Sequence, residues 1–487
     1  IPPPVPRIDR PAEAYRILLA FFRDAGFATD SICERLGISA LHEIEASTVG
    51  KQPYGEVLTA ADALTVLFVE GRSLSPAETA VLSAGGVAQM ADFGLIAESA
   101  DGIWTARVAL TPVENLYVAT DRFNEPDGTA FNGWDDLVYP CIFRTTRLFL
   151  EQIPRSPCED VLDLCSGCGV GALLSSAANR TWAADITDRA RDFARFNALL
   201  NGIENMNTLT GDMYEPSADA HYDRIVAHPP YQPVVKHSMI FNSGGLHGEE
   251  LTSRIIEGAP AHLRPGGRLY CLCQVMDRDV SAEHRIREWL GTGSEECDLV
   301  FIVHKSFEIQ RYTALSVLRS GLVESDWLEW MRQLTKWKVK EMNYGMVVVQ
   351  KRESRRPVFT VRRENGSPST FDDLQRLLDW ETHAARPGFE DYVMQKRFRT
   401  RKSSRLQIVH GFESAAWEIQ DFRILNDSPW DATIAADQPT AHLMSLLTGE
   451  RNGAACLREF RQAVDASPAE FAQRIRVLVS GGFVEQV

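Results

Sequence analysis

The 487-residue sequence lacks several features that would place it outside the ordinary soluble classes. No apolar run approaches the ~18 residues that a membrane-spanning helix needs. The first residues, Ile-Pro-Pro-Pro-Val-Pro, lack the basic segment and apolar core of a secretory signal. Cysteines are few and odd in number, at nine, which predicts reduced thiols and no disulfide framework. We therefore expect a cytoplasmic protein without membrane association, and no zinc site, because Cys165 and Cys168 have no second Cys or His pair at zinc spacing.

Basic residues are also scarce relative to acidic ones. Lys and Arg number 51 against 66 Asp and Glu, which gives a net charge of −15. This net negative charge argues against a protein that coats nucleic acid through its overall charge. A local basic patch could still bind nucleic acid. The apolar fraction of 44% and the charged fraction of 24% are typical of globular proteins and exclude a disordered or fibrous chain.

The chain length predicts about three domains. Residues 11–105 read as helices followed by a small β-wing, because apolar positions recur at helical spacing and Ser75-Pro76 is a typical helix start. This pattern is winged-helix-like, a module that serves for DNA binding, docking or dimerisation. We expect an N-terminal helical domain, a linker that lines the pocket, an alternating strand–helix domain and a C-terminal α+β module with a second winged-helix-like tail, over residues 1–105, 106–154, 155–352 and 353–487.

The third of these segments has the alternation of a parallel sheet with crossover helices. Its final two strands are separated by a helical segment, which predicts an antiparallel end to the sheet. The predicted strands are Val161–Cys165, Thr181–Ile186, Met206–Thr210, Arg224–Ala227, Arg268–Gln274, Leu299–His304 and Gly345–Gln350.

A glycine-rich turn follows the first of these strands and opens a helix. It reads Asp163-Leu-Cys-Ser-Gly167-Cys-Gly169-Val-Gly171. Glycines in this position allow the backbone to approach a ligand closely. Because dinucleotide sites and S-adenosylmethionine sites share this spacing, the turn alone does not choose between them.

Acidic residues stand at the ends of three successive strands. Asp163 precedes the glycines, Asp185 ends the second strand, and Asp212 with Met213 follows the third. Ligands of parallel α/β sheets bind at the carboxyl ends of the strands, where a carboxylate can accept hydrogen bonds from ribose hydroxyls. In register, these residues indicate a methyl-donor pocket: Asp163 for the methionine ammonium, Asp185 for the ribose, and Asp212 with Met213 for the adenine.

This spacing resembles that of class I S-adenosylmethionine-dependent methyltransferases. The resemblance implies a Rossmann-like, seven-stranded α/β core, S-adenosyl-L-methionine as the cofactor, S-adenosyl-L-homocysteine as its product, and no metal. It extends to the end of the fourth strand, where His228-Pro-Pro-Tyr231 is similar to the Asn/Asp-Pro-Pro-Tyr/Phe motif of enzymes that methylate planar nitrogens. The release-factor glutamine and N6-adenine methyltransferases form that group.

The chemistry explains the residue types in this motif. A delocalised nitrogen lone pair is a weak nucleophile, and acceptors such as the first side chain and the Pro229 carbonyl can align its N–H groups. The Tyr231 ring can stack on a flat acceptor group and stabilise developing positive charge. We therefore expect His228, Pro229 and Tyr231 to be catalytic, with Pro230 beside them in the substrate pocket.

His228 departs from the motif, because an imidazole cannot supply the paired acceptor and donor of an amide. It can act as a general base, since histidine titrates near neutral pH, or favour a different acceptor group. It can also merely shape the loop while the Pro229 carbonyl positions the substrate. The resemblance further suggests Tyr139, Thr145 and His247 as substrate-binding residues, with His237 as a weaker candidate in the same loop.

Three functions remain open from the sequence. The first is methyl transfer to an amide, guanidine, imidazole or amino nitrogen, less readily to oxygen, of a small molecule or peptide. The second is base methylation of RNA or DNA, with Lys396–Arg405 as a phosphate clamp, although a solvated β-edge is the simpler interpretation of that run. The third is a transcription regulator that uses the fold as a sensor. The flanking modules could cover the active site or form a homodimer.

Overall fold

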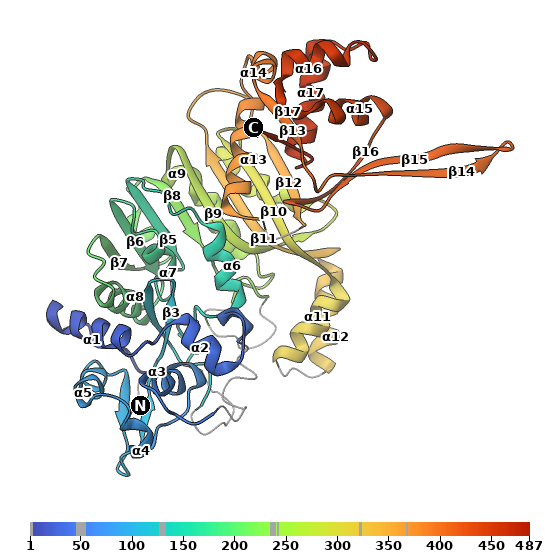
Figure 1. The fold of residues 1–487 in the computed structure, drawn as a ribbon. Coiled ribbons are helices and arrows are strands. Elements are labelled where there is room, and N and C mark those ends of the chain that lie inside the picture. The colour runs from blue at the N-terminus through green and yellow to red at the C-terminus, as the bar shows by residue number, and fades with distance from the viewer. Residues whose placement is uncertain are drawn as a thin grey trace. The chain divides into compact units, whose positions relative to one another are not determined.

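The computed structural model describes residues 3–44, 55–125, 133–233, 240, 243–320, 324–366 and 369–487. The chain forms two compact units, Ile1–Cys273 and Gln274–Val487 (Figure 1). No helix in the described ranges is long and apolar enough to cross a membrane. All nine cysteines are free thiols.

The first unit begins with short helices and small β-ribbons. Ser75 caps α4 by accepting from Glu78 N, as its position before Pro76 predicts. The predicted wing is the antiparallel pair β1–β2. The elements are α1 (Ala12–Asp24), α2 (Thr29–Leu36), η1 (Leu41–Glu43), α3 (Ala60–Thr65), η2 (Val66–Glu70), α4 (Pro76–Thr79), α5 (Ala84–Asp92), β1 (Ile96–Glu98), β2 (Trp104–Ala106), β3 (Ala109–Val113) and β4 (Leu116–Thr120).

The rest of the first unit is a parallel α/β layer. Its strands run in the order β9-β8-β5-β6-β7, and each neighbouring pair is parallel. The predicted strand–helix alternation is therefore present. The elements are α6 (Arg144–Gln152), β5 (Asp160–Leu164), α7 (Val170–Leu174), β6 (Arg180–Asp185), α8 (Asp188–Leu200), β7 (Met206–Thr210), η3 (Glu215–Ser217), β8 (Tyr222–Ala227), α9 (Glu250–His262) and β9 (Leu263–Asp277), which continues into the second unit.

Helix α8 fastens the β3–β4 ribbon to this layer. Asn197 accepts from Ala119 N at 2.7 Å and donates to Ala119 O at 2.9 Å and to Cys168 O at 3.0 Å. Asn201 repeats the exchange with the backbone of Tyr117. The segment predicted as a linker, residues 106–154, therefore contains a docked ribbon and helix α6.

The strands of the second unit run in the order β14-β15-β16-β12-β10-β11. Its β10 and β11 are antiparallel, as the sequence predicts for the end of the sheet. The elements are α10 (Ala282–Trp289), η4 (Gly291–Glu295), β10 (Cys297–Glu308), α11 (Ile309–Ser320), α12 (Glu324–Lys336), β11 (Glu341–Lys351), β12 (Thr360–Asn365), α13 (Phe371–Ala384), α14 (Phe389–Gln395), β13 (Arg397–Thr400), β14 (Arg405–Glu413), β15 (Ala416–Asn426), β16 (Trp430–Ala435), α15 (Gln438–Leu446), β17 (Thr448–Asn452), α16 (Gly453–Phe460), α17 (Pro468–Ser480) and β18 (Val484–Gln486).

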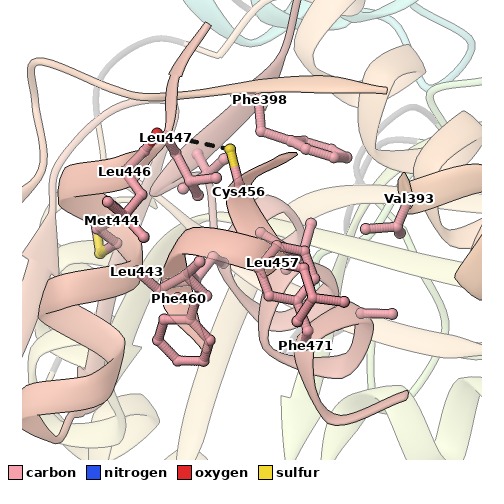
Figure 2. Packing of buried hydrophobic residues seen from close by; sticks show 14 of the residues in the cluster. Val393, Phe398, Leu443, Met444, Leu446, Leu447, Cys456, Leu457, Phe460 and Phe471 are labelled. Atoms are coloured by element: carbon pink, nitrogen blue, oxygen red, sulfur yellow. Dashed lines mark hydrogen bonds between the residues drawn. The ribbon is translucent and has the colours of Figure 1, made fainter. Parts of the chain in front are cut away.

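A hydrophobic cluster holds the C-terminal module together. Phe398 of β13, Leu457 and Phe460 of α16 and Phe471 of α17 are buried in it (Figure 2). The interpretation of Lys396–Arg405 as a β-edge is wrong for its strand, because β13 is the central strand of the β17-β13-β18 sheet and its Phe398 points into this core. Arg399 is also paired, its Nε lying 2.9 Å from Glu485 Oε1.

Candidate functional site

The carboxyl ends of four parallel strands meet at one edge of the first unit. The register aligns Leu164 at the end of β5 with Ala184 of β6 and with Ala227 at the end of β8, and it aligns Asp185 with Thr210 of β7. This edge is where α/β sheets place their ligands.

The glycine-rich turn after β5 is shaped by close contacts. A Cβ on Gly171 would lie 2.7 Å from Asp163 Oδ2, so only glycine leaves room for that carboxylate. Gly169 has φ +77°, and a Cβ there would lie 2.8 Å from Ala194 and from Met206. Gly167 has φ +51° with open space around it, so glycine is favoured there by the backbone conformation and not by lack of room. The turn thus follows the backbone path that the sequence predicts.

Two of the acids are tied to this turn. Asp163 is buried and its Oδ2 accepts from Ala172 N at 2.9 Å. Burial raises the pKa of Asp163 to about 7, and the nearby Asp185 charge contributes. Asp185 Oδ2 accepts from Gly167 N at 2.9 Å, and burial also raises the pKa of Asp185. Such raised values mark a site where a buried cation would be stabilised by the carboxylates.

The third acid, Asp212, lies near the same Cys165 thiol as Asp163 and Asp185. Burial raises the pKa of the Cys165 thiol, and the charges of Asp185, Asp163 and Asp212 raise it further. Asp212 Oδ2 accepts from Arg254 of α9 at 2.7 Å. No sequence pattern pointed to Arg254, because only the tertiary fold brings α9 to the end of β7.

A pocket of about 250 Å³ opens at this third strand. It is lined by residues after β7 and on α9, including Asp212, Met213, Tyr214, Arg254 and Glu257. Met213 has φ +52°, which places it in the left-handed region directly after Asp212. The pocket is slightly smaller than the roughly 300–1,000 Å³ typical of sites that bury a drug-sized ligand.

These residues fit S-adenosylmethionine. The buried carboxylate of Asp163 suits an ammonium, and the glycine turn leaves room for a ligand beside it. The carboxylates of Asp185 and Asp212, at the ends of the next two strands, suit a ribose and an amino-substituted ring. Ser166 Oγ is buried in the same turn and has no hydrogen-bond partner in the described part of the chain, so it is available to a ligand.

His228 directly follows β8 and is held by ring contacts. Its ring centroid lies 5.4 Å from Phe149 and 5.9 Å from Tyr231, at interplanar angles of 27° and 28°. Burial lowers the pKa of His228 to about 4. Burial disfavours protonation of this ring, so its environment moves the titration below the neutral range expected from the sequence.

Helix α6 supplies a side chain that the sequence analysis missed. Phe149 contacts His228, and Thr145 lies one turn earlier on the same face of α6. Tyr139 packs against Phe143 at 5.4 Å, just before that helix. The i, i+4 spacing of Thr145 and Phe149 could have revealed the shared face, but nothing in the sequence pairs Phe149 with His228.

The loop after the tetrapeptide packs closely on it. A Cβ on Gly244 would lie 2.7 Å from Tyr231 Cα, and one on Gly248 would lie 2.6 Å from Tyr231 O. His247 is turned toward α9, with its Nδ1 2.6 Å from Glu250 Oε1. Pro229 is buried and Pro230 is half-buried. His237 lies outside the described residues.

The described residues contain no group of three His, Cys, Asp or Glu side chains placed to hold a metal ion.

Comparison with known proteins identifies this region. Residues 142–298 match the family described as "Methyltransferase small domain". The chain is 35% identical over 128 residues to the ribosomal protein uL3 glutamine methyltransferase of Bradyrhizobium diazoefficiens, covering 23% of this chain and 40% of the relative. It is 31% identical over 124 residues to the release factor glutamine methyltransferase of Thermodesulfovibrio yellowstonii, covering 23% and 44%. The matched segment thus spans less than half the length of these relatives.

Among solved structures, similarity is found to the ribosomal protein L11 methylase of Lactobacillus delbrueckii. That match has a TM-score of 0.25 and 18% identity, and covers 42% of this chain and 77% of the other. The family match and the names of the curated relatives agree with the resemblance drawn from the motifs: residues 142–298 are similar to a methyltransferase small domain and to glutamine methyltransferases.

Proposed function

We propose that this chain is an S-adenosylmethionine-dependent methyltransferase that transfers a methyl group to a planar nitrogen of a peptide or protein. The observation that carries the proposal is the position of His228-Pro-Pro-Tyr231. It follows β8 at the strand edge where Asp163, Asp185 and Asp212 lie.

Each cofactor-binding role rests on an atom at this edge. Asp163 would hold the methionine ammonium, Asp185 the ribose hydroxyls, and Asp212 with Met213 the adenine. Gly167, Gly169 and Gly171 leave the backbone open to the ligand. When bound, S-adenosylmethionine supplies a methyl group on a positively charged sulfur.

The acceptor would be held by the tetrapeptide. The Pro229 carbonyl accepts one N–H of the acceptor group, and proline presents no competing N–H. The neutral His228 ring offers one nitrogen as a second acceptor, oriented by its stacking on Phe149. A histidine with a pKa of about 4 is a poor general base at pH 7, so we assign His228 to positioning the nitrogen. Tyr231 would stack on the flat acceptor group.

An amide of a peptide or protein is the acceptor class with the best support, because the curated relatives carry the name of glutamine methyltransferases. Thr145, Tyr139, Pro230 and His247 would line its pocket. Nucleic acid has less support. Helix α5 of the wing-bearing module, Ala84–Asp92, contains no Lys or Arg. The helix α17 of the C-terminal module lies against α13 and α14.

The test is transfer of a labelled methyl group from S-adenosylmethionine to peptide libraries. Peptides with a central Gln should be labelled, and otherwise identical peptides with Glu should not, because Glu lacks the N–H groups. Peptides with Asn, Arg or His at that position distinguish the other nitrogens. Labelling of RNA but of none of these peptides would contradict the acceptor class while leaving the cofactor site intact.

A further inference from the structure

The ribbon formed by β14 and β15 carries several exposed large apolar side chains. In Figure 1 its outer half extends as two strands without a helix of that unit on either face. Phe412 is 62% exposed and Trp417 is 70% exposed, and their rings contact each other at 5.4 Å. An isolated two-stranded ribbon is marginally stable in water, so this one needs a further source of stability.

The cross-strand register places the apolar side chains on one face. Leu406 pairs with Ile424, Ile408 with Phe422, and Phe412 with Trp417. Directly opposed residues of an antiparallel pair lie on the same face, and the positions 406, 408 and 412 are two or four apart. We call Leu406, Ile408, Phe412, Trp417, Ile419 and Phe422 the apolar ribbon face.

A β-bulge maintains this face. Val409 pairs with Asp421 but His410 pairs with Ile419, so Gln420 is the extra residue. If Gln420 were paired as an ordinary strand residue, strict alternation would place Ile419 and Trp417 on the opposite face from Phe422. The bulge therefore keeps these side chains on one face, which they share with His410, while Val409 lies on the opposite face.

This face continues the core of the C-terminal module. Ile424 belongs to the buried cluster and Ile434, its partner on β16, packs against that cluster. Beyond Ile424 the same face runs into solvent. The turn at the tip does not compensate, because Ser414 and Ala415 both adopt positive φ, at 49° and 65°, where non-glycine residues are strained.

The occupant must match an uncharged apolar surface. The opposite face and its edges carry Arg405, Arg423, Glu413, Glu418 and Asp421, two positive and three negative charges. That balance does not attract a phosphate backbone or an anionic membrane.

The area fits an identical partner. From the exposed fractions of Leu406, Ile408, Phe412, Trp417 and Ile419, each ribbon face offers roughly 600 Å² if a fully exposed large apolar side chain presents about 150–250 Å². Two such faces would bury roughly 1,200 Å² in total, the lower end of stable interfaces. One patch that packs on its own copy is the arrangement of a two-fold dimer.

We propose that the apolar ribbon face is a homodimer interface, in which the ribbons of two copies pack face to face like the layers of a β-sandwich. The proposal is independent of the methyltransferase function.

The experiment is sedimentation equilibrium of the full chain between 0.5 and 50 µM, a range set about the micromolar affinity expected of such an interface. The wild type should sediment as a dimer at the upper end. The double variant Phe412→Lys with Trp417→Lys should raise the dissociation constant about 100-fold or more, because buried aromatic anchors dominate interfaces. Glu418→Lys, beside Trp417 but on the other face, is the matched control and should remain dimeric.

The double variant Phe412→Ser with Trp417→Ser is a second variant that adds no charge. It should also abolish the dimer, because it removes the two most exposed aromatic side chains of the ribbon face. Far-ultraviolet circular dichroism checks that both variants stay folded. A monomeric wild type, or a dimer that survives both changes, would overturn the proposal. So would a monomer that binds phosphatidylcholine–phosphatidylglycerol vesicles through Trp417, since the occupant would then be a membrane.

Discussion

At the scale of single residues, substitutions of His228 test whether its ring positions the substrate nitrogen or acts as an acid–base catalyst. His228→Ala should leave the dissociation constant of S-adenosylmethionine within about twofold and lower kcat about 100-fold, because it removes one acceptor for the substrate nitrogen. His228→Asn should restore much of that loss. Single-turnover transfer of labelled methyl groups measures both. His221→Ala, at an exposed histidine before β8, is the matched control and should retain full activity.

The pH profile tests the same assignment. Since the pKa of His228 lies at about 4, kcat at saturating cofactor should be flat between pH 6 and 8. A profile that rises through pH 6.5 in the wild type and becomes flat in His228→Ala would show that the ring acts as a base after all.

Asp163 predicts a different pH dependence, in cofactor affinity. Its pKa is raised to about 7 without ligand, so it is protonated below that pH. The ammonium of the cofactor favours the ionised carboxylate, so binding must release a proton there. The affinity should weaken by up to about tenfold per pH unit below pH 7 and level off above it. Calorimetric titration in buffers of different ionisation enthalpy measures the proton release, and Asp163→Asn should abolish it.

The same group influences stability with the opposite sign. The free carboxyl in the unfolded chain titrates near 3.8, so the folded ligand-free protein binds the extra proton between about pH 3.8 and 7. Its contribution to the free energy of unfolding is present at low pH and is lost as the pH rises through 7. Cofactor binding and stability of the ligand-free protein therefore favour opposite sides of pH 7.

Adding a single methyl group at Gly171 tests whether the glycine-rich turn must stay free of side chains to bind the cofactor. In Gly171→Ala the new Cβ would lie 2.7 Å from Asp163 Oδ2, which forces the carboxylate or the turn to move. We expect at least tenfold weaker cofactor binding and a loss of about 1–3 kcal/mol in the free energy of unfolding. Gly85→Ala in α5 has no atom within 4 Å of the added group. It should leave cofactor binding unchanged and raise the free energy of unfolding by up to about 1 kcal/mol, because alanine favours a helix over glycine. Equal effects in both variants would argue against a specific cradle.

At the scale of elements, the β3–β4 ribbon depends on α8. Asn197 satisfies three buried backbone groups, on Ala119 and Cys168. Asn197→Ala leaves them unpaired and should cost about 2–4 kcal/mol in the free energy of unfolding, measured by urea denaturation. Asn207→Ala on the exposed side of β7 should cost less than about 0.5 kcal/mol. A small effect at Asn197 would mean that the ribbon is held by packing instead.

The elements also show what the sequence could predict. Strand β7 has the predicted ends, Met206 and Thr210, because turns bound it on both sides. Strand β5 ends at Leu164, one residue before the prediction, because Cys165 adopts φ +54° at the start of the turn. Local chemistry was sufficient for these positions.

Other elements were missed because their signals are non-local or weak. Strand β3 contains Pro112, which argues against a strand, yet it forms a ribbon that α8 secures. Helix α6 opens with Thr145 and Thr146, which are poor helix formers, so the helix that carries Phe149 was not predicted. Helix α13 was missed although its Thr370–Asp373 capping box could have revealed it.

For the candidate site, the acids and glycines could be identified from their order along the chain, since parallel strands place their carboxyl ends together. The contacts of His228 with Phe149 and of Asp212 with Arg254 could not, because each joins residues of different elements that only tertiary packing brings together.

At the scale of the whole molecule, we expect methyl transfer and dimerisation to depend on different parts of the chain. The first unit contains all residues assigned to methyl transfer, and the apolar ribbon face belongs to the second. Loss of the dimer through Trp417 should therefore leave cofactor affinity unchanged, and loss of cofactor binding should leave the dimer intact.

The most direct test of the central claim is calorimetric titration of the full chain with S-adenosylmethionine and S-adenosylhomocysteine. We expect one site with micromolar affinity. Asp185→Ala should abolish binding, because it removes the carboxylate that accepts from Gly167 N and orders the turn. Absence of binding to both ligands, or binding that Asp185→Ala leaves unchanged, would contradict the assignment of this strand edge as the methyl-donor site.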